Sequence, residues 1–90
     1  MPYIRQDARE SVNKHIDNLL KVITMFSDSQ KSGVMNYTIT SLINHVYRMD
    51  NPSYKEINDA MGMLECVKQE LYRRKAAPYE DIKINENGDI

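Results

Sequence analysis

The feature that most constrains this chain is the spacing of its apolar residues, which recur every three or four positions along three separate stretches. Such spacing places apolar side chains on one face of an α-helix. We therefore predict helices over residues 7–26, 35–49 and 54–75. β-Branched residues are frequent in the middle stretch, so a strand is an alternative for part of it. The positions expected to face a shared core are Val12, Ile16, Leu19, Leu20, Ile23, Phe26, Met35, Ile39, Leu42, Ile43, Val46, Met49, Ile57, Ala60, Met61, Leu64, Val67 and Leu71.

Turn-forming residues separate these stretches. Residues 27–33 are rich in Ser, Asp and Gly and are predicted to form a loop. Pro52 ends the second helix, because the residue before a proline avoids the α region. Ser53 and Glu56 match a capping box, which predicts the start of the third helix at this point. Pro78 is expected to stop that helix.

The last fifteen residues differ from the rest of the chain. Ile82, Ile84 and Ile90 are apolar positions in a polar segment, and residues 81–84 alternate with period two. We interpret residues 76–90 as a short extended arm or small hairpin that packs on its own helices or on a neighbouring subunit. The predicted fold is all-α: an antiparallel three-helix unit over residues 1–75, with the C-terminal arm in the same domain.

A chain of 90 residues can build only a modest core. Met25, Met63, Tyr37 and Tyr47 lie off the apolar stripes and need another surface to cover them, so we predict a homo-oligomer. One cysteine, Cys66, leaves no intramolecular disulfide to form, and no signal peptide or membrane-length apolar run is present. These features predict a cytoplasmic protein, in the host cell cytoplasm if the chain is viral, that does not bind membranes.

Few residues suit catalysis or metal binding. Cys66 lies mid-helix without a nearby base, and His15 and His45 lack a second ligand one turn away. Two carboxylate pairs, Asp7 with Glu10 and Glu56 with Asp59, have the spacing by which helical nucleotide pyrophosphohydrolases hold Mg²⁺. Both pairs lie in first helical turns, where acidic residues favour the helix dipole. We therefore predict no cofactor, no metal and no enzyme, with a Mg²⁺-dependent hydrolase as a third alternative.

An anion site is the most specific binding hypothesis. Cations and tyrosines gather near the end of the third predicted helix, where guanidinium groups could hold phosphates and rings could stack on bases. The alternative is a helix C-terminus carrying the cations that its dipole favours. One face of the second predicted helix carries neutral hydrogen-bonding groups instead of charges. The predicted ligand-binding residues are Arg48, Lys68, Tyr72, Arg73, Arg74, Lys75, Tyr79, Asn36, Tyr37, Thr40 and Asn44.

Sequence-specific nucleic-acid binding is not predicted. Residues 1–75 carry 11 Lys and Arg against 9 Asp and Glu, an excess of only +2. DNA-binding domains usually show a strongly basic face. The third predicted helix instead presents Glu56, Asp59, Glu65 and Glu70, which would repel phosphates.

Several segments resemble a family of small phage and bacterial proteins described only as a domain of unknown function. The resemblance lies in Met1–Ile4, Ile57–Asn58, Met63–Lys68, Leu71–Arg74, Ala76–Asp81 and Glu86–Asp89. It implies a phage or prophage setting and brings no catalytic residues.

The sequence thus predicts a non-catalytic binding module. Its most specific form is a viral anti-defence protein that sequesters a phosphate-bearing (cyclic) nucleotide signal, by analogy with small helical viral proteins of similar architecture. The competing interpretation is a protein-interaction module that inhibits a host protein.

Overall fold

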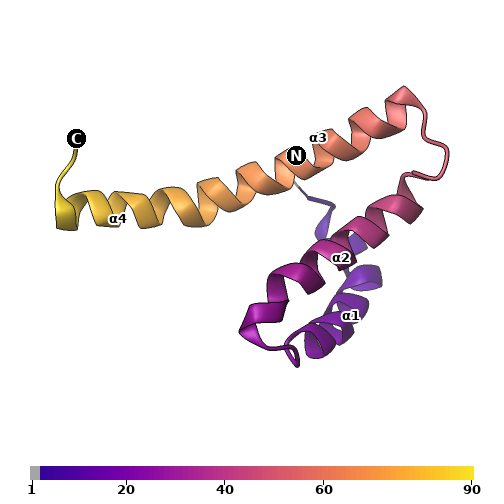
Figure 1. Ribbon diagram of the computed structural model, residues 1–90, viewed down its shortest axis with the longest axis horizontal. Coiled ribbons are helices and arrows are strands. Elements are labelled where there is room, and N and C mark those ends of the chain that lie inside the picture. The colour runs from indigo at the N-terminus through magenta and orange to yellow at the C-terminus, as the bar shows by residue number, and fades with distance from the viewer. Residues whose placement is uncertain (1–2) are drawn as a thin grey trace.

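The computed structural model describes residues 3–90, and Met1 and Pro2 of the family-like opening segment lie outside the described residues. The described chain is helical and contains no strand, which confirms the all-α class and removes the strand alternative (Figure 1). Its elements are α1 (Gln6–Ile23), α2 (Asp28–Val46), α3 (Tyr54–Leu71), the π-helical turn Tyr72–Ala76 and α4 (Ala77–Asn87).

Helix α2 begins seven residues earlier than the sequence predicts. The Ser27 N–H donates to Gln30 Oε1 at 3.2 Å, and the Ser27 hydroxyl lies 2.9 Å from the same oxygen. This is a capping box, which satisfies backbone donors that a helix start otherwise leaves open. The predicted loop over residues 27–33 is therefore wrong beyond Ser27, because the capping box allows the helix to begin at Asp28.

Helix α2 ends in a left-handed turn at Arg48, whose φ is 52°. The Met49 N–H donates to the Asn44 carbonyl at 3.0 Å, the long hydrogen bond of a Schellman ending. Glycine is the usual residue at such a position, because a Cβ raises the energy of the left-handed region. Arg48 therefore adopts a backbone conformation that is energetically unfavourable for a residue with a Cβ atom.

This turn gives a test of local strain. We expect Arg48→Gly to be more stable than Arg48→Ala by about 1 kcal/mol, since only glycine adopts positive φ without penalty. Both variants lose the arginine side chain equally, so their difference isolates the backbone. Urea unfolding followed by circular dichroism measures it, and equal midpoints for the two variants would show that the turn is not strained.

The start of α3 confirms the predicted capping box. The Ser53 hydroxyl accepts the Glu56 N–H at 3.2 Å, and Glu56 Oε1 accepts the Ser53 N–H at 3.3 Å. The pairing fixes the first turn of α3 directly after the Pro52 loop.

The end of α3 departs from prediction. Pro78 lacks the N–H that an α-helix would use at this point, and its ring crowds the preceding turn. The backbone widens instead of stopping: the Ala77 N–H donates to the Tyr72 carbonyl, five residues back. Beyond this π turn, α4 continues to Asn87, where Gly88 takes a φ of 88° and ends it. The predicted extended arm over residues 76–90 is therefore wrong, because the wider turn accommodates Pro78 within one continuous rod (Figure 1).

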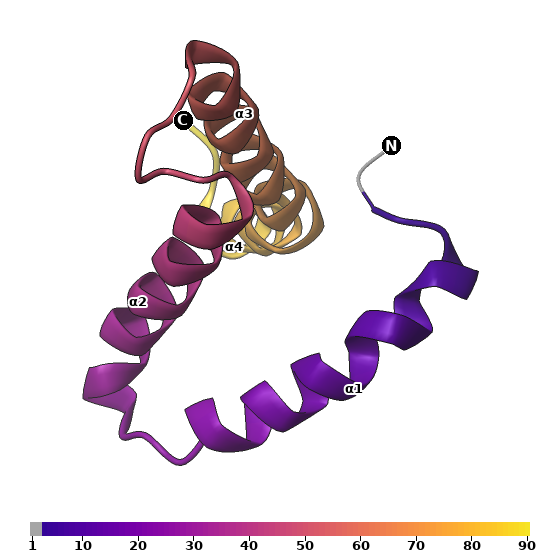
Figure 2. The same cartoon turned by 90° about the vertical axis from the view of Figure 1, so that its right-hand side faces the viewer.

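The three helical arms form an open frame. Helices α1 and α2 diverge from the turn that joins them, and the loop after α2 leads into the α3–α4 rod, which runs away from it to the C-terminus (Figures 1 and 2). The Cα radius of gyration is 16.8 Å, whereas a compact chain of this length would have about 12 Å. The predicted antiparallel packing of three helices is not confirmed.

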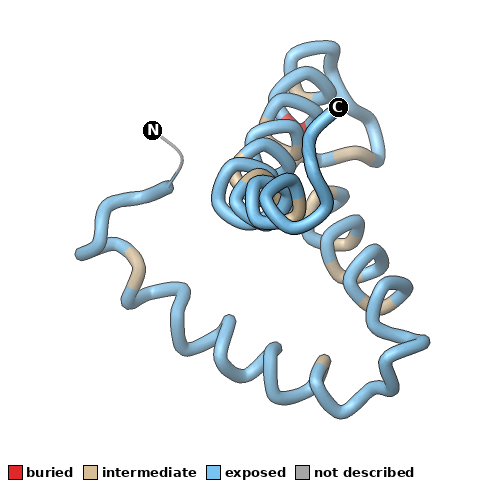
Figure 3. The backbone as a smooth tube through the Cα atoms, turned by 90° about the vertical axis from the view of Figure 1, so that its left-hand side faces the viewer, coloured by how far each residue is buried: buried red, intermediate tan, exposed pale blue. Residues whose placement is uncertain are grey.

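Burial is correspondingly slight. Among residues 3–90, Ala60 alone is buried, with 3% of its surface exposed (Figure 3). The accessible surface is 8123 Å², whereas a compact monomer of this mass exposes roughly 5,400 Å². The chain therefore leaves about 2,700 Å² exposed that a closed fold would bury. The apolar stripes form as helices but do not close into a core.

Candidate functional site

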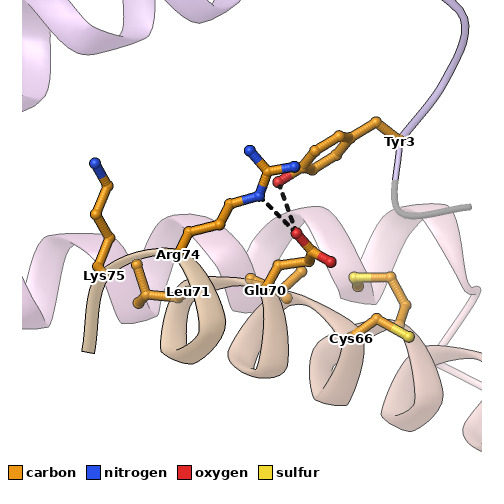
Figure 4. Close-up of a pocket in the computed structure, with 8 residues that line it drawn as sticks. Tyr3, Cys66, Glu70, Leu71, Arg74 and Lys75 are labelled. Atoms are coloured by element: carbon orange, nitrogen blue, oxygen red, sulfur yellow. Dashed lines mark hydrogen bonds and ion pairs between the residues drawn. The ribbon is translucent and has the colours of Figure 1, made fainter. Parts of the chain in front are cut away.

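The carboxylate of Glu70 organises the predicted cation cluster. Its oxygens accept hydrogen bonds from Arg73 Nη2 at 3.1 Å and from Arg74 Nε at 2.7 Å. The Tyr3 hydroxyl, from the segment before α1, lies 3.5 Å from the same carboxylate (Figure 4). The two arginines expected to bind phosphate thus already donate hydrogen bonds to one carboxylate, that of Glu70.

Charge pairing shifts the protonation of this group. The Arg74 hydrogen bond, with a smaller contribution from Arg73, holds the pKa of Glu70 below its ordinary value. A lowered carboxyl pKa means that the pairing is complete at neutral pH. It is lost only as the pH falls through the folded-state pKa of Glu70. At physiological pH a phosphate would have to compete with Glu70 for both arginines.

An apolar hollow of about 450 Å³ adjoins this cluster on α3. Tyr3 forms one wall, with the Arg74 guanidinium 5.3 Å from its ring centre, a cation–π distance. Figure 4 shows Tyr3 reaching over the α3 backbone toward Arg74 and Glu70, while Cys66 lies farther back along the helix. The lining residues are Tyr3, Met63, Cys66, Val67, Glu70, Leu71, Arg74 and Lys75. The hollow therefore combines an apolar floor with cations at one end.

The four predicted hydrogen-bonding residues of α2 line a second, shallow hollow. Its walls are uncharged and offer hydroxyl and amide groups, and Thr40 Oγ1 donates to Asn36 Oδ1 at 3.3 Å. The lining residues are Ser32, Gly33, Asn36, Tyr37, Thr40, Ser41 and Asn44. Asn44 also lines a neighbouring hollow that contains Arg48. The predicted α2 residues and Arg48 therefore line two adjacent hollows that share Asn44. The hollows beside Arg73 and Arg74 are separate from both.

Two further predicted cations are paired with carboxylates. Arg48 Nε lies 3.3 Å from Glu56 Oε2, and Lys68 Nζ lies 3.3 Å from Glu65 Oε2. Both pairs are solvent-exposed on the cation side, where ion pairs contribute little to stability. They nevertheless reduce the positive potential that a phosphate would meet.

The two predicted stacking tyrosines also have local partners. The Tyr72 hydroxyl donates to Glu80 Oε2 at 3.2 Å, and the Glu80 carboxylate raises the pKa of Tyr72. The Lys83 ammonium lies 5.6 Å from the Tyr79 ring centre. Tyr72 shares a shallow hollow with Lys68 and Arg73. This places three predicted site residues on one face of the rod.

The carboxylates of the predicted pair Glu56 and Asp59 contact different cations. Glu56 caps α3 and contacts Arg48, whereas Asp59 Oδ2 lies 2.7 Å from Lys55 Nζ. Within residues 3–90, no group of three His, Cys, Asp or Glu side chains is placed to hold a metal ion. The described helices also include none long and apolar enough to span a bilayer.

Comparison with known protein families identifies the family of this chain. A family model described as a domain of unknown function, DUF6899, matches residues 1–90. The chain belongs to this family. No curated protein and no solved structure matched the chain. Membership in DUF6899 thus supports the predicted resemblance, while the phage setting stays a prediction.

Sequence reasoning missed two members of the Glu70 cluster in this DUF6899 chain. Glu70 stands three and four positions before Arg73 and Arg74, the spacing at which helical ion pairs form, so the sequence contained that signal. Tyr3 is separated from Glu70 by most of the chain, and no local pattern indicates their contact. The apolar hollow depends on that contact and could not be predicted.

Proposed function

We propose that this DUF6899 chain is a non-catalytic protein-interaction module that binds another protein through the apolar face of α1. The observation that carries the proposal is the exposure of that face. Ile16 and Leu20 are 47% and 52% exposed, although both belong to one helical stripe. An exposed apolar patch flanked by polar residues is typical of a protein-binding surface.

Charge supports this surface over the cation cluster. Arg73 and Arg74 already contact Glu70, so an anionic ligand gains only by displacing it. The α1 stripe needs no such exchange, because burying apolar side chains is favourable in itself. Full burial of one Ile or Leu contributes about 1.5–3 kcal/mol. In a specific interface of about 1,600 Å², a few such buried residues contribute most of the binding energy.

A matched pair of charge substitutions tests this surface. Ile16→Lys puts an ammonium in the middle of the stripe, and we expect it to weaken partner binding by at least about tenfold, since a half-exposed Ile contributes roughly 1.4 kcal/mol or more when buried. Asn18→Lys adds the same charge about 160° around α1, by the 100° helical step, and should bind normally. Affinity purification from the natural host, followed by titration of the retained protein, measures both.

The comparison contradicts the proposal in either of two ways. In the first, the wild-type chain retains no protein whose binding is lost in the Ile16→Lys variant. The other is that the two lysine variants bind equally well. Circular dichroism of both variants confirms that helix content is unchanged.

A second candidate, sequestration of a phosphate-bearing nucleotide, is favoured by the α2 hollow. Four side chains predicted to supply hydrogen bonds line it together, and Arg48 stands in the hollow next to it. Neutral hydroxyl and amide groups suit base and ribose recognition, and an arginine suits phosphate. In a viral setting, this arrangement would remove a host nucleotide signal without cleaving it.

Thermal shift against cyclic and linear nucleotides tests the second candidate. A ligand at 100 times its Kd adds about 2.7 kcal/mol of stability, so a binding nucleotide raises the Tm without turnover. Arg48→Ala should remove most of the ligand-dependent rise, because Arg48 is the cation beside the α2 hollow that would hold the phosphate. The absence of any Tm rise across the panel rejects sequestration, whereas Mg²⁺-dependent turnover lost in Glu56→Ala would indicate the hydrolase.

A further inference from the structure

The exposed side of the α3 hollow is a second apolar surface, distinct from the α1 face. Val67 and Leu71 form its floor and are 57% and 63% exposed. Met63 and Cys66 continue the same strip toward the start of α3, following the three-to-four spacing of one helix face. Cys66 is exposed as well, whereas Met63 is half-buried, and Tyr3 lies along one edge of the same hollow. We call Met63, Cys66, Val67 and Leu71 the rod strip.

We propose that the rod strip is covered by the rod strip of a second copy of this chain, with the two rods antiparallel. In such an isologous pair, a two-fold axis passes between the rods near Cys66 and Val67. Each copy then contributes the same residues to both sides of the interface. This goes beyond the proposed function, which uses α1 and a different protein.

The exposed area favours a second copy as the occupant. Each chain exposes about 2,700 Å² more than a compact monomer of its mass, an excess spread over all its helices and including the rod strip. Obligate homodimers bury roughly 2,000–5,000 Å² in total, so two chains together expose enough to form one. A second copy is also present wherever the chain itself is present, at the same concentration.

The distribution of charge along the rod selects the antiparallel orientation. Residues 54–66 carry one cation and three carboxylates, a net charge of −2. Residues 67–76 carry four cations and one carboxylate, a net charge of +3. An axis near Cys66 and Val67 places the acidic stretch of each rod beside the basic stretch of the other. A parallel pair would instead juxtapose the two +3 stretches, which repel.

The ion pairs beside the strip lower the cost of association. Glu70 already contacts Arg73 and Arg74 within each chain. Charges that are paired and hydrogen-bonded before association lose less on desolvation than isolated charges. The cluster can therefore lie at the edge of the interface while the apolar strip fills its centre, the usual arrangement of a polar rim around an apolar centre.

Solution mass of two matched variants tests the interface. Val67→Glu puts a carboxylate next to the proposed axis, where it meets its own copy, and we expect the dimer Kd to rise by at least about 100-fold. Gln69→Glu adds the same charge about 160° away around α3 and should leave the dimer intact. Val67 is more than half exposed in the single chain, so the substitution removes no intrachain core. Sedimentation equilibrium across a concentration series measures the dimer Kd of the wild type and of both variants.

Distances between spin labels test the orientation. In a Cys66→Ser background, labels on Lys55→Cys and, separately, on Asn85→Cys report the separation of equivalent rod positions in the dimer. With 1.5 Å per residue, the antiparallel pair predicts about 35 Å for position 55 and about 55 Å for position 85. A parallel pair brings each label to its own copy at less than about 20 Å.

Three results overturn the inference: a wild-type monomer at every concentration, a dimer that Val67→Glu leaves intact, or short distances at both labels. None of these bears on the α1 face. If the chain is a monomer and binds a host protein that Ile16→Lys no longer binds, the rod pairing alone is rejected. If the chain is a dimer and binds no such protein, the proposed function alone is rejected.

Discussion

Burial of apolar surface is the constraint on which the rest of this structure depends. Folding orders every residue at an entropic cost that only burial on a large scale can offset. In this chain each helix has an apolar stripe, yet Ala60 alone among residues 3–90 is buried. The helices are therefore well defined by their ends and spacing, while their packing is incomplete. Both proposals, a foreign protein on α1 and a second copy on the rod, supply the missing burial.

Helix positions were predictable where periodicity and end chemistry agree. The apolar spacing located α1, α2 and α3, and the Ser53–Glu56 capping box fixed the start of α3 to the residue. The same chemistry is present at Ser27 and Gln30, but the polar composition of residues 27–33 suggested a loop. End signals were thus more informative than composition, because they describe specific backbone hydrogen bonds.

Pro78 illustrates where local reasoning fails. A proline inside a helix removes one hydrogen bond and crowds one carbonyl, which normally ends or kinks the helix. Here the π turn shifts the hydrogen bond of Ala77 to Tyr72 and makes room for the ring. The result is a single rod from Tyr54 to Asn87 in place of a helix followed by an arm. Whether Pro78 ends the helix or is accommodated by a π turn depends on the backbone geometry of several residues. No single residue type indicates that geometry.

The candidate site was predictable only in part. The sequence located Arg73 and Arg74, but their charge is shared with Glu70, and Tyr3 joins them from the far end of the chain. Long-range contacts of this kind convert a cation cluster into the wall of an apolar hollow. Because both arginines are already paired, the structure favours protein association over anion binding at this cluster.

The concentration dependence of unfolding tests the central claim most directly. If the isolated chain is incomplete and becomes stable by association, its Tm must rise with protein concentration, because a partner that binds the folded state stabilises it by mass action. We predict a rise of several degrees between micromolar and hundred-micromolar protein. A sharp transition at the same temperature across that range would show that one chain folds stably alone, and would contradict the account.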